Sequence, residues 1–249
     1  MGESFELPLG VVHNGNVTKD IVLTPMTAKI RRLIANRANQ KNPANGLTDV
    51  LGHCCESIAG RPPAPQLINA LTVGDRDFML LMLRKISLGD IIKAKMTCVS
   101  CQEDLAFDIG IDDIRIRRLE LGKNFELDGD YPVVKIESEE LGLKVTVRLP
   151  TGFDQGAISG QVKTDPIGAS YAMYARLIKK WERNGKIDET ARTVDFIDNL
   201  PLRDIEWLEE AVRKASPGPE WQVSLTCEVC GKRTPLDLSD TDFLFKTPR

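Results

Sequence analysis

The chain has 249 residues, of which 42% are hydrophobic and 28% are charged. These fractions are typical of a globular protein with a hydrophobic core, and a net charge of −3 argues against a protein that is a nucleic-acid binder as a whole. No apolar run approaches the roughly 18 residues needed to cross a bilayer, and the first ten residues lack the basic and apolar regions of a secretory signal. We therefore expect a soluble, intracellular chain of one large domain or two small ones.

The N-terminal part of the sequence predicts a strand followed by two helices. The strand carries the motif LPLG at 7–10. Helices are expected over 28–40 and 46–58. The second of these would place six apolar residues on one face: Leu47, Val50, Leu51, Cys54, Cys55 and Ile58. The proline-rich stretch 61–65 is expected to be a loop.

A further helix leads into a turn with two cysteines. Thr72 and Asp75 have the pattern of a capping box at its start, and Gly89 is expected to end it. Between them, four apolar residues recur at helical spacing: Phe78, Met79, Met82 and Leu83. The turn MTCVSC at 96–101 follows, flanked on both sides by residues typical of strands.

The remaining sequence predicts a second set of similar elements after a connection at 112–132. Apolar and polar residues alternate over 143–149, which indicates a half-buried strand, and the motif LPTG closes it at 149–152. A helix is expected over 167–181. Another begins near Pro201 and should end at Gly218, with Trp207, Leu208, Ala211 and Val212 in its apolar positions. The turn LTCEVC at 225–230 then mirrors the earlier one.

The two cysteine turns belong to a longer internal match. Shifting the chain by 129 positions lays the segment from Ile68 over the segment from Ile197 without a gap. Besides the cysteines, the identical pairs are Ile68/Ile197, Leu71/Leu200, Asp75/Asp204, Arg84/Arg213, Lys85/Lys214, Ser87/Ser216, Gly89/Gly218, Thr97/Thr226 and Asp108/Asp237. LPLG also echoes LPTG, at an offset of 142. We therefore predict an internally duplicated α+β fold, with a first repeat at 1–118 and a second at 119–249, each a strand, helices and a CxxC hairpin.

Four cysteines in two matched turns predict a structural zinc site. A CxxC turn points two thiolates at one centre, and two such turns complete the four-sulfur shell that structural Zn²⁺ prefers. We assign Cys98, Cys101, Cys227 and Cys230 to one Zn²⁺ shared between the two repeats. Disulfides within each turn, a thioredoxin-like redox motif and two turns without metal remain open as alternatives.

The other reactive residues have simpler explanations. Cys54 and Cys55 are adjacent on an apolar helix face, so we expect them to be buried core residues. His53 and His13, the only histidines, are expected at a helix boundary and in a loop. The acidic residues Glu137, Glu139 and Glu140 are expected in a solvated turn, and the basic residues Lys29, Arg31, Arg32 and Arg37 on a solvated helix face. The sequence has no phosphate-binding loop and no nucleophile elbow.

The order of these motifs resembles that of a known family. An LPxG strand, a helical stretch, DRDFMLLMLRKISLGD, CVSC, KVTVRLPTGFDQ, CEVCG and DTDFLF follow one another along most of the chain. This order is similar to the T-even-type phage baseplate protein family, the hub and hub-assembly proteins of contractile phage tails and related injection systems.

The resemblance implies a non-enzymatic structural or assembly component of the baseplate hub. Such a protein would contact other baseplate, hub or tail-tube proteins in the host cytoplasm during assembly or in the virion tail, with no membrane. The apolar residues Phe243, Leu244 and Phe245 are candidate docking contacts.

Two other function classes follow from the cysteines. A zinc-ribbon nucleic-acid-binding module is the alternative, but Glu103 and Asp104 at one turn balance Lys232 and Arg233 at the other, so nucleic acid is an unlikely partner. The third class is an enzyme on a zinc-stabilised scaffold. It would need a recognisable set of catalytic residues, and the sequence shows none.

Overall fold

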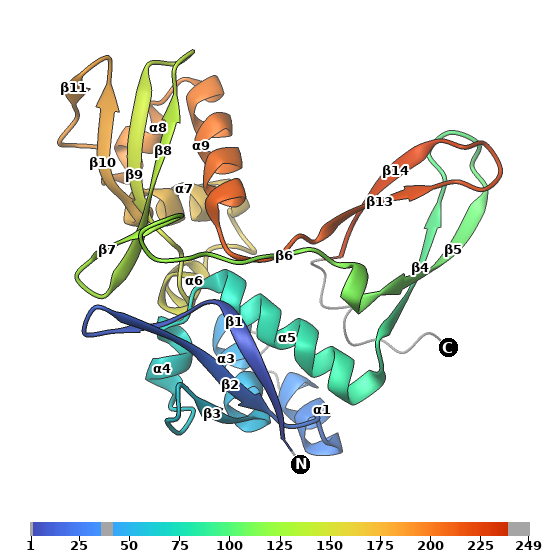
Figure 1. Cartoon of the computed structure of the whole chain (residues 1–249). Helices are drawn as coiled ribbons and strands as arrows, with labels where there is room; N and C mark the ends of the chain where they lie inside the picture. Colours follow the sequence, from blue (N-terminus) through green and yellow to red (C-terminus); the bar gives the residue numbers. More distant parts are fainter. Residues whose placement is uncertain (1, 36–41, 239–249) are drawn as a thin grey trace.

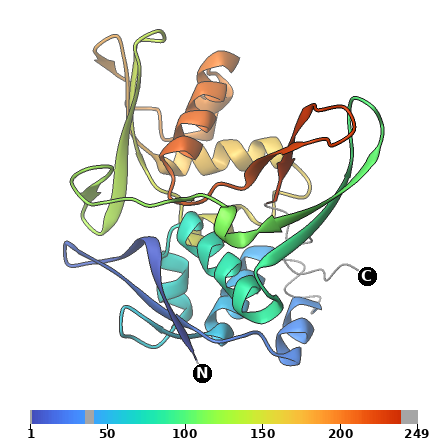
Figure 2. The same ribbon diagram turned by 45° about the vertical axis from the view of Figure 1, so that its right-hand side comes forward.

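The computed structural model describes residues 2–35 and 42–238, and it is a mixed α+β structure (Figure 1). Two units, each a small antiparallel sheet with helices packed against it, lie next to each other. A pair of β-hairpins extends from them as an arm (Figures 1 and 2). The first unit is made of elements between residues 3 and 88, and the second of elements between 126 and 215.

The first unit is built on a three-stranded sheet in the order β1-β2-β3. Strands β1 (Glu3–His13) and β2 (Asn16–Leu23) form a hairpin, and β3 (Cys55–Ile58) pairs with β2. The hairpin turns at Asn14 and Gly15, which both have positive φ, 51° and 75°. This two-residue geometry matches the right-handed twist of paired strands. The helices of the unit are α1 (Ala28–Ala35), α3 (Pro43–Cys54), α4 (Pro65–Ala70) and α5 (Val73–Leu88).

The start of α5 also joins the helix to the sheet. The backbone N–H of Asp75 donates to Thr72 Oγ1 at 3.1 Å, which confirms the predicted cap. The carboxylate does not return to the backbone of Thr72 as a capping box requires. It accepts the backbone N–H groups of Leu9, at 2.8 Å, and Gly10, at 3.2 Å, both in β1. The hydroxyl of Thr72 therefore caps the helix, and the buried carboxylate of Asp75 holds strand β1.

The second unit is built on a five-stranded antiparallel sheet in the order β11-β10-β9-β8-β7. Its strands are β7 (Glu126–Asp128), β8 (Tyr131–Ser138), β9 (Leu143–Arg148), β10 (Ile178–Arg183) and β11 (Lys186–Ile187). Its helices are α6 (Gly152–Ile158), α7 (Pro166–Leu177), α8 (Val194–Asp198) and α9 (Leu202–Ala215). The strand expected over 143–149 is confirmed as β9.

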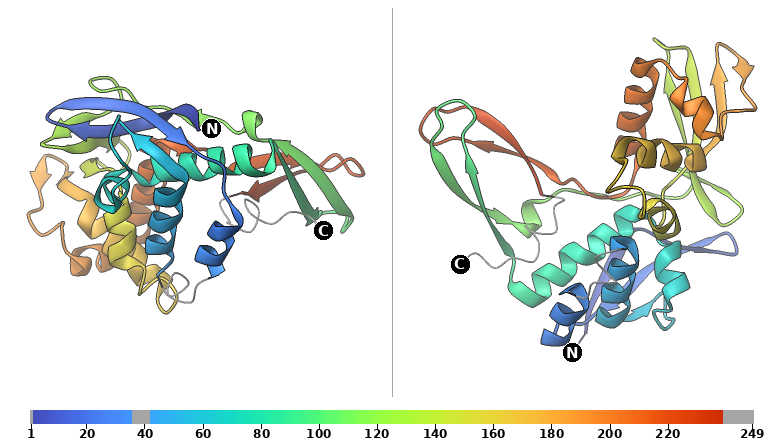
Figure 3. Two further views of the ribbon diagram at one scale, coloured as in Figure 1. Left: turned by 90° about the horizontal axis from the view of Figure 1, so that it is seen from below. Right: turned by 180° about the vertical axis from the view of Figure 1, so that it is seen from behind.

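The arm consists of two antiparallel hairpins that extend away from both units (Figure 3). One is β4 (Ile91–Thr97) with β5 (Asp104–Gly110), and the other is β13 (Gln222–Thr226) with β14 (Arg233–Asp237). A 3₁₀ turn at Ile111–Asp113 follows β5. The short strands β6 (Ile116–Arg117) and β12 (Gly218–Pro219) pair at the base of the arm.

The elements of the two units follow the same order along the chain. Within 2–35 and 42–238, each has a hairpin, two helices, a third strand antiparallel to the second hairpin strand, a short helix, a long helix and a CxxC hairpin. The LPxG correspondence does not fit this order. Residues 7–10 lie inside β1, the first strand of its hairpin, whereas 149–152 follow β9, the second strand of its hairpin. The echo of these two motifs is therefore not a structural equivalence.

Two hydrophobic cores match the two units. The first core joins the sheet and helices of the first unit to the base of the arm, including Ile92 and Leu238. The second core centres on β8–β10 with α7 and α9, including Trp181, which is 2% exposed. Strand β1 contributes Leu7 to the first core and Leu9 to the second. The two units therefore pack on a shared strand as well as on each other's helices.

Two predicted helices end differently in the structure, and the end of a third lies outside the described residues. The helix expected over 46–58 is α3, which stops at Cys54, and Cys55–Ile58 form β3. The helix expected over 167–181 stops at Leu177, and Trp181 lies in β10. In both places a short apolar run satisfies helix and strand spacing equally, and pairing with a neighbouring strand decides the outcome. The helix expected over 28–40 is described as α1 up to Ala35, and 36–40 lie outside the described residues.

Of the two glycines that were predicted to end helices, one does so and the other does not. Gly89 ends α5 with a φ of 92°, as predicted. Helix α9 instead ends at Ala215 with Ser216 as its cap, and Gly218 lies in β12. The prediction for Gly218 was wrong because the backbone of this glycine packs closely against the backbone of Gly74 in α5.

Candidate metal centre

The two cysteine turns have the same backbone geometry. In the first, the N–H of Cys98 donates to the carbonyl of Glu103 at 2.8 Å, and the N–H of Gln102 donates to the carbonyl of Cys98 at 3.0 Å. In the second, the N–H of Cys227 donates to Lys232 at 2.9 Å, and the N–H of Gly231 donates to Cys227 at 2.8 Å. The residue after the second cysteine has positive φ in both turns, 59° at position 102 and 72° at position 231. Each hairpin therefore ends in the same knuckle.

The four sulfur atoms of the two knuckles meet at the tip of the arm. They all lie within 4.8 Å of one another, and both Cys98–Cys230 and Cys101–Cys227 are separated by 3.7 Å between Sγ atoms. Four ligands about 2.3 Å from a tetrahedral zinc ion would be about 3.8 Å apart, so the donor set and its spacing suit this ion. A disulfide would require about 2.05 Å. All six cysteines of the chain are free thiols.

The first cysteine of each knuckle is buried and the second is exposed. Cys98 and Cys227 are 0% and 2% exposed. The backbone N–H groups of Cys101 and Ser100 lower the pKa of Cys98 to about 6, because they donate to its sulfur. The N–H of Glu103 lowers the pKa of Cys101, but desolvation and the neighbouring cysteine side chains outweigh it and raise this pKa to about 12. Without metal, the lowered pKa of Cys98 favours its thiolate. A metal cation would stabilise several of the thiolates together.

The first hairpin is held at its base by the end of α5. The guanidinium of Arg84 donates to the carbonyl of Gly89 and to the carbonyl of Ile91, the latter at 2.5 Å. Lys85 forms an ion pair with Asp112, in the 3₁₀ turn that follows β5, at 2.5 Å. These contacts fix the direction in which β4 leaves the helix.

The second hairpin is anchored on the same helix by a backbone crossing. A Cβ added to Gly74 of α5 would lie 1.8 Å from the carbonyl oxygen of Pro217, and one added to Gly218 would lie 2.7 Å from Cα of Gly74. Only glycine permits this approach. The indole of Trp221 then donates to Asp77 of α5 at 3.4 Å. Both hairpins are thus anchored on α5, the second near the start of the helix and the first near its end.

The arrangement allows structural metal binding and no catalysis that needs an open coordination position. Four sulfur ligands fill a tetrahedral shell, so no site is left for substrate or water. The predicted metal residues Cys98, Cys101, Cys227 and Cys230 form the only cluster of three or more potential metal ligands within 2–35 and 42–238.

The remaining predicted residues lie apart from this cluster. Cys54 and Cys55 are buried, 1% and 6% exposed, and burial raises the pKa of both to about 11. His13 is exposed at the β1–β2 turn, and exposed His53 contacts the carbonyl of Asp49. The acidic residues at 137–140 lie at the β8–β9 turn. Phe243, Leu244, Phe245 and Arg37 lie outside the described residues.

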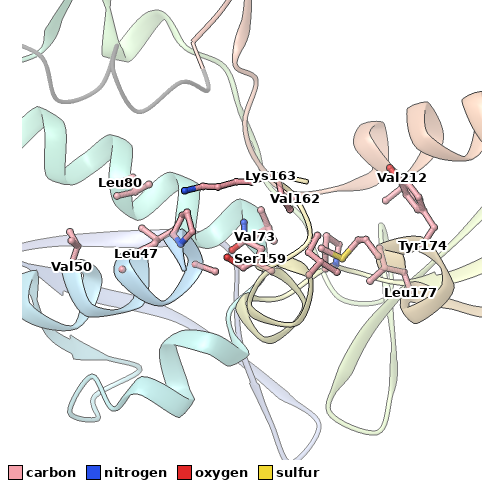
Figure 4. A pocket seen from close by; sticks show the side chains of 17 residues that line it. Leu47, Val50, Val73, Leu80, Ser159, Val162, Lys163, Tyr174, Leu177 and Val212 are labelled. Carbon is pink, nitrogen blue, oxygen red and sulfur yellow. The ribbon is translucent and has the colours of Figure 1, made fainter. Parts of the chain in front are cut away.

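Sequence reasoning missed an apolar groove between the two units. It has a volume of about 880 Å³, and its walls come from α3 and α5 on one side and from α6, α7 and α9 on the other (Figure 4). Most of its residues are apolar positions of helices in the sequence. They become a groove only because the two units pack side by side, so periodicity contains no signal for it.

Comparisons with known proteins address the identity of the chain. No helix in the described ranges is long and apolar enough to cross a membrane. Comparison with curated proteins and with solved structures gives no match. A family model described as T4 bacteriophage base plate protein matches residues 11–246, which include the first unit from Val11 onward, the whole second unit, the arm and all four clustered cysteines. The chain therefore belongs to the T4 bacteriophage base plate protein family.

Proposed function

We propose that the chain is a structural or assembly component of the baseplate hub of a contractile phage tail or a related injection system. The observation that carries this proposal is the family match over 11–246. The protein works through contacts with other baseplate, hub or tail-tube proteins, in the host cytoplasm during assembly and in the virion baseplate if it stays there. It is not an enzyme. The closed four-sulfur geometry at the arm tip agrees with a structural role.

The arm tip binds one Zn²⁺ through Cys98, Cys101, Cys227 and Cys230. The 3.7 Å sulfur separations and the two matching knuckles support this assignment. The metal would join two hairpins whose cysteines are 129 positions apart, and it would thus add a long-range link to a small β structure with little core of its own.

The chain is an internal duplication, with repeats at 1–118 and 119–249. The shared order of elements supports this division, since the third strand, long helix and CxxC hairpin recur in both units. The two hydrophobic cores support it too, because the first draws mainly on residues before 118 and the second mainly on residues after it. Two related units joined at one tip would present similar but unequal surfaces to neighbouring tail proteins.

The assembly role is tested with purified full-length protein and the separately purified hub and tail-tube proteins of the same phage. We expect a complex that co-elutes in size-exclusion chromatography, and we expect deletion of the gene to leave tails without a normal baseplate in electron micrographs. Failure to bind any tail protein, together with normal tails after deletion, would refute the role.

The metal assignment has an independent test. Elemental analysis of protein purified under reducing conditions should give one zinc per chain, with the mass in solution measured on the same sample. Four reactive thiols at the tip and no metal would mean that the knuckles are packing turns. The assembly role would not depend on that result.

A further inference from the structure

The groove between the units has the properties of a binding surface. On one side Leu47 of α3 and Leu80 of α5 face it, and on the other side Tyr174 of α7 and Val212 of α9 (Figure 4). Val162, at its rim, is 45% exposed. Its volume of about 880 Å³ and its mostly apolar walls are within the range of known ligand sites.

One polar group in the groove lacks a partner. The side-chain oxygen Oε1 of Gln155, on α6, is buried and accepts no hydrogen bond within the described part of the chain. A buried acceptor without a donor is unfavourable, so an occupant that brings an N–H group would be stabilised there. A peptide backbone supplies such a group together with apolar side chains.

The described chain ends close to this groove. Asp77 lies between Val73 and Leu80 on the same face of α5, at helical spacing, and both of these neighbours line the groove. The indole of Trp221 donates to Asp77 at 3.4 Å, and the backbone N–H of Leu238 donates to the carbonyl of Trp221 at 2.9 Å. Leu238 is the last described residue, so the following segment starts beside the groove-lining helix.

We infer that the groove binds the chain's own segment 239–249, SDTDFLFKTPR, through Phe243, Leu244 and Phe245. Phe243 is five positions after Leu238, which allows a reach of about 17 Å at ~3.4 Å per residue. The three apolar side chains suit the apolar walls, and a backbone N–H of the segment donates to Gln155.

Binding of this segment would close the groove to other proteins. A tethered segment competes at an effective concentration of the order of millimolar, so an external peptide could enter the groove only after the tethered one leaves. The segment would also bridge the two units, because the groove walls belong to both.

The test uses a fluorescein-labelled peptide of residues 239–249 and two full-length chains. One is the wild type, and the other carries Phe243→Ser and Phe245→Ser. We expect the peptide to bind the double variant at least ~10-fold more tightly than the wild type in fluorescence anisotropy, because the wild-type groove is already occupied. In the double variant, a further Val162→Glu substitution should weaken peptide binding by at least ~10-fold.

Val194→Glu is the matched control, because Val194 is 41% exposed and does not line the groove. It should leave the affinity of the double variant unchanged. Equal peptide affinity for wild type and double variant, no binding to either, or no effect of Val162→Glu would overturn the inference. A wild-type dimer that becomes monomeric in the double variant would also overturn it, since the segment would then come from a second copy.

Discussion

Substitution of Gly74 by alanine tests the backbone crossing that positions the second hairpin. The new Cβ would lie 1.8 Å from the carbonyl oxygen of Pro217 and 2.5 Å from its carbonyl carbon. Both are backbone atoms, so the chain leading to β12 must move by more than an ångström. Two opposing terms decide the result. Alanine in place of glycine within a helix contributes up to about 1 kcal/mol of stability, whereas forced overpacking costs about 1–3 kcal/mol or more.

We expect the steric cost to exceed the helix term, because the clash is with backbone and is far below contact distance. A net loss of about 2 kcal/mol corresponds to a melting temperature lower by about 4–8 °C for a chain of this length. Thermal and urea unfolding, followed by circular dichroism, measure this loss. If the arm depends on the crossing, a chelator should also remove metal faster from the variant than from the wild type.

Gly160→Ala is the control, because nothing lies within 4 Å of a Cβ at that position. It should change the melting temperature by less than about 2 °C, since surface substitutions stay near ±0.5 kcal/mol. A Gly74→Ala variant as stable as the wild type, or more stable, would refute the reasoning. It would mean that the segment before β12 moves aside at little cost and does not hold the second hairpin.

Three further predictions concern the metal and two buried carboxylates. Cys98→Ser should reduce zinc well below one per chain and lower the melting temperature, whereas Cys54→Ser should leave the zinc content unchanged in the same elemental analysis. Burial raises the pKa of Asp154, but hydrogen bonds from Arg148 and Thr151 outweigh it and lower the pKa to about 2. The wild type should thus lose roughly 2 kcal/mol of unfolding free energy as the pH falls from about 4 through about 2, and Asp154→Asn should abolish this dependence in urea titrations. Burial raises the pKa of Asp75 to about 6, so its contribution is present below about pH 4 and is lost as the pH rises through 6. That loss is about 3 kcal/mol, and Asp75→Asn should flatten the stability curve between pH 4 and 7; an unchanged slope would contradict the assignment.

The arm and its cysteine cluster were the best predicted part of the molecule. Both hairpins, both CxxC turns and the meeting of Cys98, Cys101, Cys227 and Cys230 followed from spacing and from the match at an offset of 129. This succeeded because the knuckle is a local structure. Its two internal hydrogen bonds and its positive-φ residue depend on a few neighbouring residues only, and these features occur in both turns.

Predictions were wrong where two local structures satisfy the same pattern. Cys55 and Ile58 continue the apolar face of α3 as well as they form a strand, and Trp181 continues α7 as well as it enters β10. Pairing with β2 and β9 decides between them, and those partners are distant in sequence. Gly218 was assigned to a helix end, because a glycine after a helix usually has that role and its contact with Gly74 is not visible in the sequence.

The sequence by itself thus determined the helical and strand periodicities, the two cysteine knuckles and the likeness to a phage baseplate family. Each of these depends on residues close together in the chain or on a repeated pattern. Only the tertiary structure decided that β1 serves both cores, that Asp75 holds β1, and that the groove lies between the units. These features arise from contacts between residues far apart in sequence. Such contacts depend on how whole elements pack, and side-chain periodicity does not encode that packing.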